Sequence, residues 1–200
     1  MTNRQLAALE TKKKLLAAGR RLICEKGLAH TSIEEITEAA GVSKGTFYTY
    51  FNRKEDIVFE LSHCMFGEIL ACAKVFPGDF PARLRCYMVN FSGYIEQGSV
   101  RLAQEWVRNV VNPDLVEDAF DREKLRCDLQ AVSSLIESGV AEGLLKPDIP
   151  AAELAEILVD LLYGQMLCWS MSGGSYSLKE RTEIFCRHHL PELLGKYLPG

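Results

Sequence analysis

The amino-acid sequence predicts an all-α protein with a small N-terminal domain and a larger helical bundle. Apolar residues recur at spacings of three and four rather than two, and residues that start or end helices are frequent. Positive charge is concentrated at the front: residues 1–55 hold ten Lys and Arg against six Asp and Glu, whereas the remainder holds 13 against 21. This asymmetry indicates that only the front of the chain meets phosphate.

Two helices are expected first. One runs from Arg4 or Leu9 to Lys26, with Gly27 as its stop. The next covers residues 33–40, because Ser32 and Glu35 form an S-x-x-E capping box at its start and Gly41 ends it.

A third and a fourth helix follow closely. Ser43 is placed to cap a helix over residues 44–50. The pair Asn52 and Glu55 reads as a second reciprocal cap, so a longer helix is expected to begin after Asn52 and to reach about Val75. Five further helices are expected over residues 81–97, 100–111, 114–142, 151–171 and 177–189, with Pro191 kinking or restarting the last.

The short helices over 33–40 and 44–50 carry the strongest functional signal. Two helices of this length are unstable alone and must pack on the first helix through the tight turn at 41–43. Ile33, Ile36 and Phe47 supply apolar surface for that packing. The geometry is that of a helix-turn-helix over about residues 32–51.

The outward face of the helix over 44–50 suits the DNA major groove. Lys44 can reach guanine acceptors or phosphate, Thr46 can touch a thymine methyl group, and Gly45 permits close backbone approach. Tyrosine hydroxyls and helix N-termini can hold phosphates. The candidate DNA-contacting residues are Thr31, Ser32, Ser43, Lys44, Gly45, Thr46, Tyr48, Tyr50 and Lys54.

The stretch from Thr31 to Phe51, followed by Lys54-Glu55, resembles the signature of TetR-family repressors. The match covers about the first 60 residues; Tyr50 stands where the family commonly has His. The resemblance implies a DNA-binding domain over 1–54 and a ligand-binding and dimerisation domain over 55–200. It further implies a dimer on a palindromic operator, a small-molecule effector, and repression as the default, although residues alone do not separate repressor from activator.

Residues 151–171 are apolar nearly all round, so that helix must be buried on two sides. One side faces its own domain, and a second subunit is the expected cover for the other. The helix that begins near Ser177 carries a further apolar stripe, formed by Ile184, Phe185, Leu190, Leu193 and Leu194. In the family the last two helices form the dimer interface, so we expect a homodimer through the eighth and ninth helices.

Aromatic residues in the body are usually core, but the resemblance raises the chance that some line an effector cavity. The expected lining residues are Phe66, Tyr87, Phe91, Tyr94, Trp106 and Trp169, with Arg108 or Gln165 as polar partners.

Other classes of function have less support. No Glu-x-x-His pair, glycine-rich phosphate loop or zinc box is present, so we expect neither an enzyme nor a metal or other cofactor. Seven cysteines leave a redox sensor open, with Cys127 and Cys186 beside arginines, although buried inert thiols are the simpler interpretation. A ligand-binding or scaffolding dimer is a further alternative. Without a signal peptide or a long apolar run, we expect a cytoplasmic protein with no membrane partner.

Overall fold

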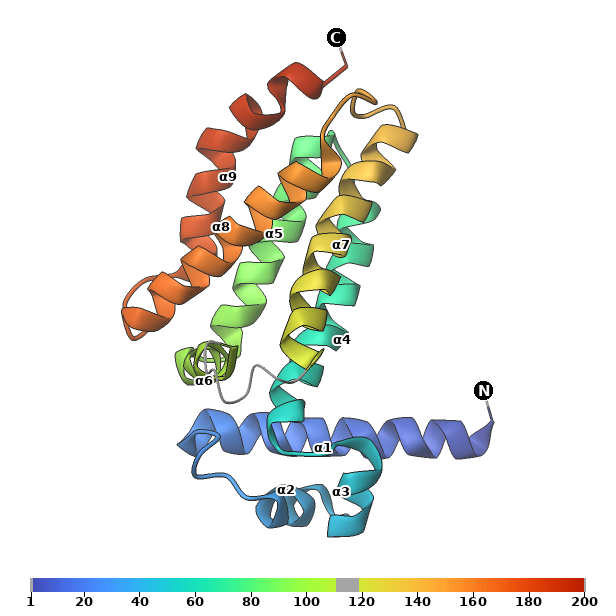
Figure 1. The fold of residues 1–200 in the computed structure, drawn as a ribbon, viewed down its shortest axis with the longest axis vertical. Coiled ribbons are helices and arrows are strands. Elements are labelled where there is room, and N and C mark those ends of the chain that lie inside the picture. The colour runs from blue at the N-terminus through green and yellow to red at the C-terminus, as the bar shows by residue number, and fades with distance from the viewer. Residues whose placement is uncertain (1, 111–118, 200) are drawn as a thin grey trace.

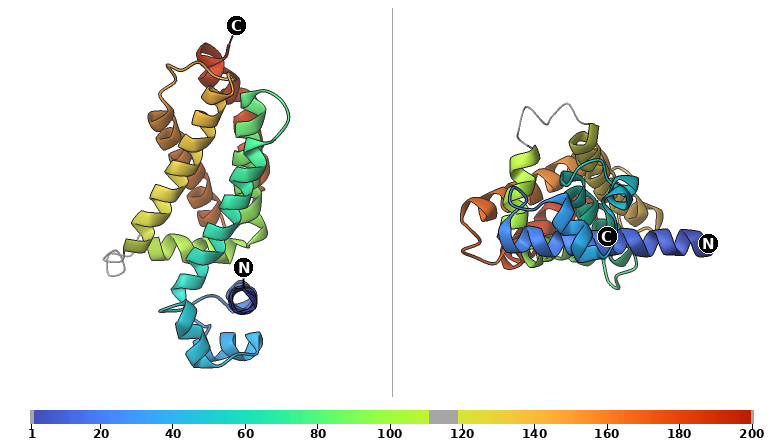
Figure 2. Two further views of the ribbon diagram at one scale, coloured as in Figure 1. Left: turned by 90° about the vertical axis from the view of Figure 1, so that its right-hand side faces the viewer. Right: turned by 90° about the horizontal axis from the view of Figure 1, so that it is seen from below.

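The computed structural model describes residues 2–110 and 119–199, which form nine α-helices and one 3₁₀ turn without strands. Figure 1 shows a head made of the first three helices, from which α4 rises into an upright bundle. In the turned view of Figure 2, α2 and α3 again lie on the side of α1 that is remote from the bundle. The all-α prediction with two parts is confirmed.

The head contains α1 (Asn3–Lys26), α2 (Ile33–Ala40) and α3 (Lys44–Tyr50). The bounds of α2 and α3 agree with those expected from their caps. Ser32 and Glu35 make both hydrogen bonds of the capping box, and Ser43 accepts from the Thr46 backbone N–H. Gly41 ends α2 in the left-handed conformation, at φ 68° and ψ 36°, where side chains other than glycine are strained.

The first turn of α4 (Glu55–Lys74) belongs to the core of the head. Ile57 is fully buried there together with residues of all three preceding helices, namely Leu15, Ile23, Ile36 and Phe47. A Cβ atom on Gly19 would lie 2.8 Å from the Cδ1 and Cγ2 atoms of Ile57, so glycine allows α1 and α4 to cross closely.

The expected Asn52–Glu55 cap is wrong. Lys54 is the residue that precedes α4, and it makes no side-chain cap. The Asp56 carboxylate instead accepts from the backbone N–H groups of Asn52 and Arg53, at 2.8 and 3.2 Å, and from Arg53 Nε. Asp56 is 7% exposed, and its bonds to residues three and four positions earlier hold the turn that leads into α4.

The body comprises α5 (Phe80–Gln97), α6 (Val100–Val110), α7 (Ala119–Ala141), α8 (Ala151–Met171) and α9 (Leu178–Leu194), followed by the turn η1 (Gly195–Tyr197). Its core lies between α4, α5, α7, α8 and α9. The expected start of the seventh helix at Asp114 and the expected end of the sixth at Val111 lie outside the described residues. The ninth helix continues through Pro191 and ends five residues beyond the expected His189.

Among the described residues, α8 is the one helix that is long enough and apolar enough to cross a membrane, judged by length and composition alone. Leu158, Val159 and Leu162 are nevertheless buried in the core of the body. In Figure 1, α8 crosses in front of α5 and beside α9. These contacts identify it as the core helix of a bundle.

Gly19→Ala is expected to destabilise the protein although it removes a helical glycine. The added methyl group meets the branched Ile57 side chain, and overpacking of this kind costs about 1–3 kcal/mol. Urea unfolding monitored by circular dichroism measures the effect. Gly67→Ala is the control, because its Cβ has open space and should stabilise α4 by about 0.5–1 kcal/mol. A stable Gly19→Ala variant would refute the close crossing.

Candidate nucleic-acid interface and internal cavity

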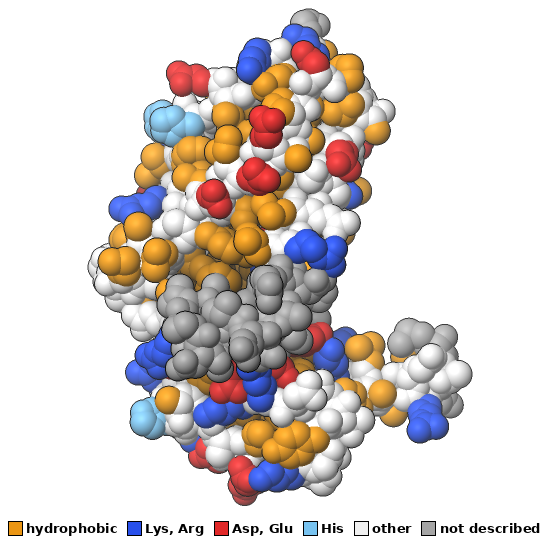
Figure 3. Space-filling view, in the orientation of Figure 1, with side chains coloured by type: hydrophobic (Ala, Val, Ile, Leu, Met, Phe, Trp, Pro, Cys, Tyr) orange, Lys and Arg blue, Asp and Glu red, His pale blue; other side chains and the backbone are white. Residues whose placement is uncertain are grey.

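Helix α3 divides its residues cleanly between core and solvent. Phe47 is fully buried, whereas Lys44, Gly45, Tyr48 and Thr49 are exposed. Tyr48 keeps 50% of its surface exposed although its ring packs edge-on against Phe47 at 5.6 Å. The helix therefore presents a polar and aromatic face on the outside of the head, and Figure 3 shows both basic and acidic side chains on this part of the molecule.

Lys44 at the start of α3 forms an ion pair with Glu34 of α2. The Glu34 carboxylate raises the pKa of Lys44, and the hydrogen bond from Lys44 lowers the pKa of Glu34. Both side chains are more than half exposed, so water screens the pair and a stronger anion can replace Glu34.

Gly45 has no packing partner that explains it. A Cβ atom there would meet nothing closer than Ser43 Oγ at 3.8 Å. Glycine in an exposed helix costs roughly 1 kcal/mol relative to alanine. No packing contact within the fold explains this cost. Close approach of another molecule to the backbone at Gly45 would explain it.

Ser43 and Thr46 face each other at the start of α3. The Ser43 hydroxyl accepts from the Thr46 backbone N–H at 3.1 Å and lies 2.9 Å from Thr46 Oγ1. Ser43 is exposed and Thr46 half-buried. Tyr50 is half-buried and packs against the core of the head, so less of it is free than of Tyr48.

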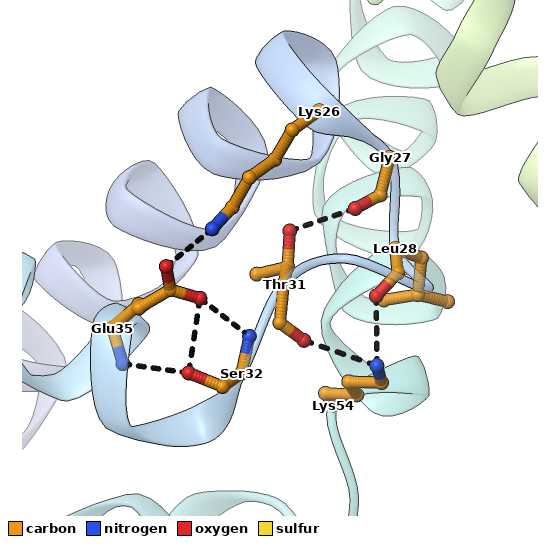
Figure 4. A network of polar contacts seen from close by, with 7 residues as sticks. All are labelled: Lys26, Gly27, Leu28, Thr31, Ser32, Glu35 and Lys54. Carbon is orange, nitrogen blue, oxygen red and sulfur yellow. Dashed lines mark hydrogen bonds and ion pairs between the residues drawn. The ribbon is translucent and has the colours of Figure 1, made fainter.

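The structure gives Thr31 and the half-buried Lys54 hydrogen-bond partners within the head (Figure 4). Thr31 is 1% exposed, and its hydroxyl donates to the Gly27 carbonyl at 2.8 Å. Lys54 Nζ donates to the carbonyl oxygens of Leu28 and Thr31 at 2.7 and 3.0 Å. These bonds hold the connection between α1 and α2 against the start of α4, so both side chains have partners within the head.

Ser32 is engaged in the same network. Its hydroxyl donates to Glu35 Oε2 at 2.9 Å and accepts from the Glu35 N–H. The Lys26 ammonium group binds the other carboxylate oxygen, and together with Ser32 it lowers the pKa of Glu35 to about 2. The cap of α2 is thereby tied to the end of α1.

An internal cavity of about 60 Å³ lies where α4, α5, α6, α7 and α8 meet. Its lining is almost wholly apolar and aromatic. Four of the expected residues line it, namely Phe66, Phe91, Tyr94 and Trp106. The rings of Phe66 and Phe91 stack at 4.4 Å, and Trp106 meets Tyr163 edge-on at 5.3 Å.

The other four expected lining residues have different roles. Tyr87 is fully buried in the core of the body, and within the described part of the chain its hydroxyl has no hydrogen-bond partner. Gln165 accepts from Thr182 at 2.6 Å, and Trp169 Nε1 donates to the Tyr176 carbonyl at 2.8 Å. Arg108 is largely exposed and pairs with Glu105. None of the four lines the cavity.

Among the lining residues outside the expected set are two with polar groups, Lys124 and Tyr163. Lys124 is 3% exposed and forms an ion pair with Asp128, one turn further along α7. Tyr163 OH donates to the same carboxylate oxygen at 2.6 Å. In the sequence, Lys124 and Asp128 have the four-residue spacing of an ordinary solvated pair, so only the fold reveals that they are buried.

The cysteines give little support to redox or metal chemistry. Cys186 is 3% exposed and contacts Met88, and burial raises the pKa of its thiol to about 12. His188 and His189 are exposed on the outside of α9. Among the described residues no group of three His, Cys, Asp or Glu side chains is arranged to hold a metal ion.

The chain is similar to known regulatory proteins over most of its length. Residues 15–61 match the family described as bacterial regulatory proteins, tetR family. The chain is 27% identical over 199 residues to the HTH-type transcriptional regulator AcrR of Shigella flexneri, covering 96% of this chain and 91% of that protein.

Solved structures have the same fold. Regulatory protein TetR from Rhodobacter sphaeroides is 26% identical, with a TM-score of 0.61 over 89% of this chain and 98% of that one. Thermus thermophilus FadR, in complex with lauroyl-CoA, is 23% identical, with a TM-score of 0.68 over 91% and 94%.

Lys54→Met is expected to destabilise the head by about 1–2 kcal/mol, because two carbonyl oxygens lose a charged donor. Urea unfolding measures the loss. Binding to any duplex should weaken as well, while the slope of log K against log salt changes by well under the 0.9 expected for one lost phosphate contact.

The matched variant Lys44→Met tests the opposite case, since the exposed Lys44 lies on the outer face of α3. It should leave stability almost unchanged and weaken DNA binding. A Lys54 variant of unchanged stability whose salt slope fell by about 0.9 would restore the phosphate-contact role.

Proposed function

The chain belongs to the TetR family of bacterial transcriptional regulators, and on that premise we propose how its DNA-binding and sensing parts work. The chain is a DNA-binding repressor whose hold on DNA responds to a ligand. Regulators of this family bind DNA as dimers. The observation that carries the proposal is the outer face of α3, where Lys44 and Tyr48 are exposed and no packing contact explains Gly45.

The proposed reading surface is smaller than the set expected from sequence. Lys44 and Thr46 contact base edges, after Lys44 exchanges Glu34 for DNA. Tyr48 contacts the phosphate backbone, and Tyr50 does so through its exposed edge. Gly45 permits the backbone of α3 to approach the DNA closely. Ser43 and the exposed Thr49 flank this surface, whereas Thr31, Ser32 and Lys54 support it from within.

We also propose the division of the chain into a DNA-binding domain over residues 1–54 and a ligand-binding domain over residues 55–200. Ile57, which lies beyond this boundary, contributes to the core of the head.

We assign the dimer interface to α8 and α9. Large apolar side chains on these helices remain exposed in the single chain: Ile157 (58%), Leu167 (42%), Met171 (79%) and Ile184 (49%). Figure 3 shows hydrophobic side chains gathered over this face of the body. A second copy of the chain would cover them and present two α3 helices to successive major grooves.

The cavity is proposed as the effector site because α4 connects it to the head. Val58 and Leu61 line the cavity, while the neighbouring Ile57 packs against Gly19 in the head. A second connection joins α1 to the turn before α6: Cys24 Sγ contacts the carbonyl of the cavity residue Gly98 at 3.0 Å, and Arg101 donates to the Glu25 carbonyl. A ligand that favours a wider cavity would therefore shift the population of head positions.

The effector is an apolar small molecule in this proposal. About 60 Å³ of space is far below the several hundred typical of ligand sites, so the aromatic pairs must part on binding. The lauroyl-CoA of the Thermus thermophilus structure shows only what that protein holds. We also propose a cytoplasmic location, since the operator is there.

The decisive experiment selects duplexes from a random pool at defined salt. The proposal predicts inverted repeats whose half-site centres lie about 10 base pairs, or a multiple of that spacing, apart. The proposal would be overturned if binding showed no sequence preference, or if added salt did not weaken binding. Adding candidate effectors to the selected duplex then separates repression relieved by ligand from activation that requires it.

Gly45→Ala is expected to stabilise the protein by about 0.5–1 kcal/mol and yet to weaken operator binding at least tenfold. The methyl group improves helix propensity where no protein atom opposes it, but it occupies the space next to the DNA. Thermal unfolding and fluorescence anisotropy measure the two effects. Operator affinity equal to that of the native chain would show that α3 does not approach DNA at this residue.

Ile157→Glu combined with Met171→Glu should convert the dimer to a monomer at micromolar concentration, because two charges would face an apolar partner surface. Sedimentation velocity measures the change, and operator affinity should fall at least about a hundredfold. Val75→Glu is the control, since Val75 is 79% exposed but lies between α4 and α5. A double variant that stays dimeric would move the interface elsewhere.

A further inference from the structure

A buried cation faces the cavity. Lys124 of α7 is 3% exposed and lines the cavity among otherwise apolar and aromatic residues. Its ammonium nitrogen lies 4.4 Å from the centre of the Phe66 ring and 5.9 Å from that of Tyr163. Among the described residues that line the cavity, Lys124 alone carries a full charge.

The counter-charge lies behind the cation rather than in the cavity. Asp128 is absent from the cavity lining and instead borders a separate groove with Phe66, Gly67 and Cys127. Lys124 and Tyr163 both donate to its Oδ2 atom. A molecule inside the cavity therefore meets the ammonium group before it meets the carboxylate.

Lys124 retains hydrogen-bonding capacity on the cavity side. An ammonium group has three N–H donors, and Asp128 is its one hydrogen-bond acceptor within the described part of the chain. The remaining donors face aromatic rings, which satisfy a cation less well than an oxygen anion does. Burial lowers the pKa of Lys124, although Asp128 opposes this effect, so a second acceptor would favour its charged form.

We propose that the cavity selects an anionic amphipathic effector, whose apolar body separates the aromatic rings while its carboxylate binds Lys124. This inference rests on the proposed role of the cavity as effector site and specifies the ligand's chemistry. The opposite choice, a cationic ligand, would have to pass Lys124 to reach Asp128 and would meet like charge on entry.

A ligand bound at Lys124 would also change the packing of α4, because Lys124 contacts Phe66 of that helix. Phe66 of α4 stacks on Phe91 and lies beneath the Lys124 ammonium group. An anion that draws Lys124 away from the Phe66 ring, or a body that parts Phe66 from Phe91, changes how α4 packs against α7 and α5. Since α4 also anchors the head, the charged contact and the aromatic contact act on the same helix.

The test uses three probes with one aromatic body: 1-naphthoate, 1-naphthamide and 1-naphthylmethylammonium. Calorimetric titration of the full-length chain should rank naphthoate at least about tenfold tighter than the amide, with the ammonium weakest. If the amide or the ammonium matches naphthoate, or if naphthoate does not bind at millimolar concentration, the proposal is overturned.

Two variants test whether the preference for naphthoate arises at Lys124. Asp128→Asn removes the carboxylate that holds Lys124 charged but leaves the Lys124 amine and an acceptor for Tyr163. A bound naphthoate is then the anion that favours the charged form of Lys124, so this variant should keep or strengthen the preference for naphthoate. Lys124→Met combined with Asp128→Asn removes both buried charges together and should reduce the preference to within about twofold. A preference that survives the double variant places the anion elsewhere. If a variant does not fold by circular dichroism, the ranking of the native chain decides alone.

DNA titrations of the same preparations keep this inference separate from the regulator proposal. A chain that ranks the probes as expected but binds no selected duplex contradicts the regulator proposal alone. A chain that binds its operator with salt dependence but prefers the amide or the ammonium contradicts the anionic effector alone.

Discussion

The packing of the first turn of α4 against α1 is the contact on which the rest of the structure depends. Helices of eight and seven residues, α2 and α3, have no stability of their own. Their position depends on the core around Ile57 and on the Lys54 ammonium group, which binds two carbonyl oxygens of the preceding connection. Because α4 continues into the body, the proposed DNA-reading surface and the cavity are joined by one continuous helix.

Charge is used differently at the two ends of that element. On the head, the Lys44–Glu34 pair is exposed, so it exchanges partners at little cost. In the body, the Lys124–Asp128 pair is buried, and removal of either partner alone would leave an uncompensated charge in an apolar region. The first arrangement suits a surface that must release its own partner for DNA, and the second suits a site that discriminates between ligands by charge.

Much of the fold could be predicted because its determinants are local. The bounds of α2, α3 and α8 agree with those expected from Ser32, Ser43, Gly41 and the residues around α8. Two expectations differ from the structure. Asp56 rather than its neighbour Glu55 accepts from the N–H groups before α4, a choice between adjacent carboxylates that spacing does not decide. Helix α9 extends past Pro191 because Leu190 and Leu194 pack in the core of the body. Of the aromatic residues expected in the cavity, Tyr87 packs in the core of the body and Trp169 packs in a smaller cluster with Leu178, since helical spacing does not tell which neighbour a buried ring faces.

By itself, the sequence determined the helical fold, the helix-turn-helix and the resemblance to its family, since caps, turns and apolar spacing act within a few residues. Tertiary structure alone decided which polar side chains are free. It turned Thr31 and Lys54 inward, left Lys44 and Gly45 on the surface, and buried Lys124 beside the cavity. The physical reason is that a side chain's exposure and partners depend on elements far away in the chain, and these meet only when the core forms.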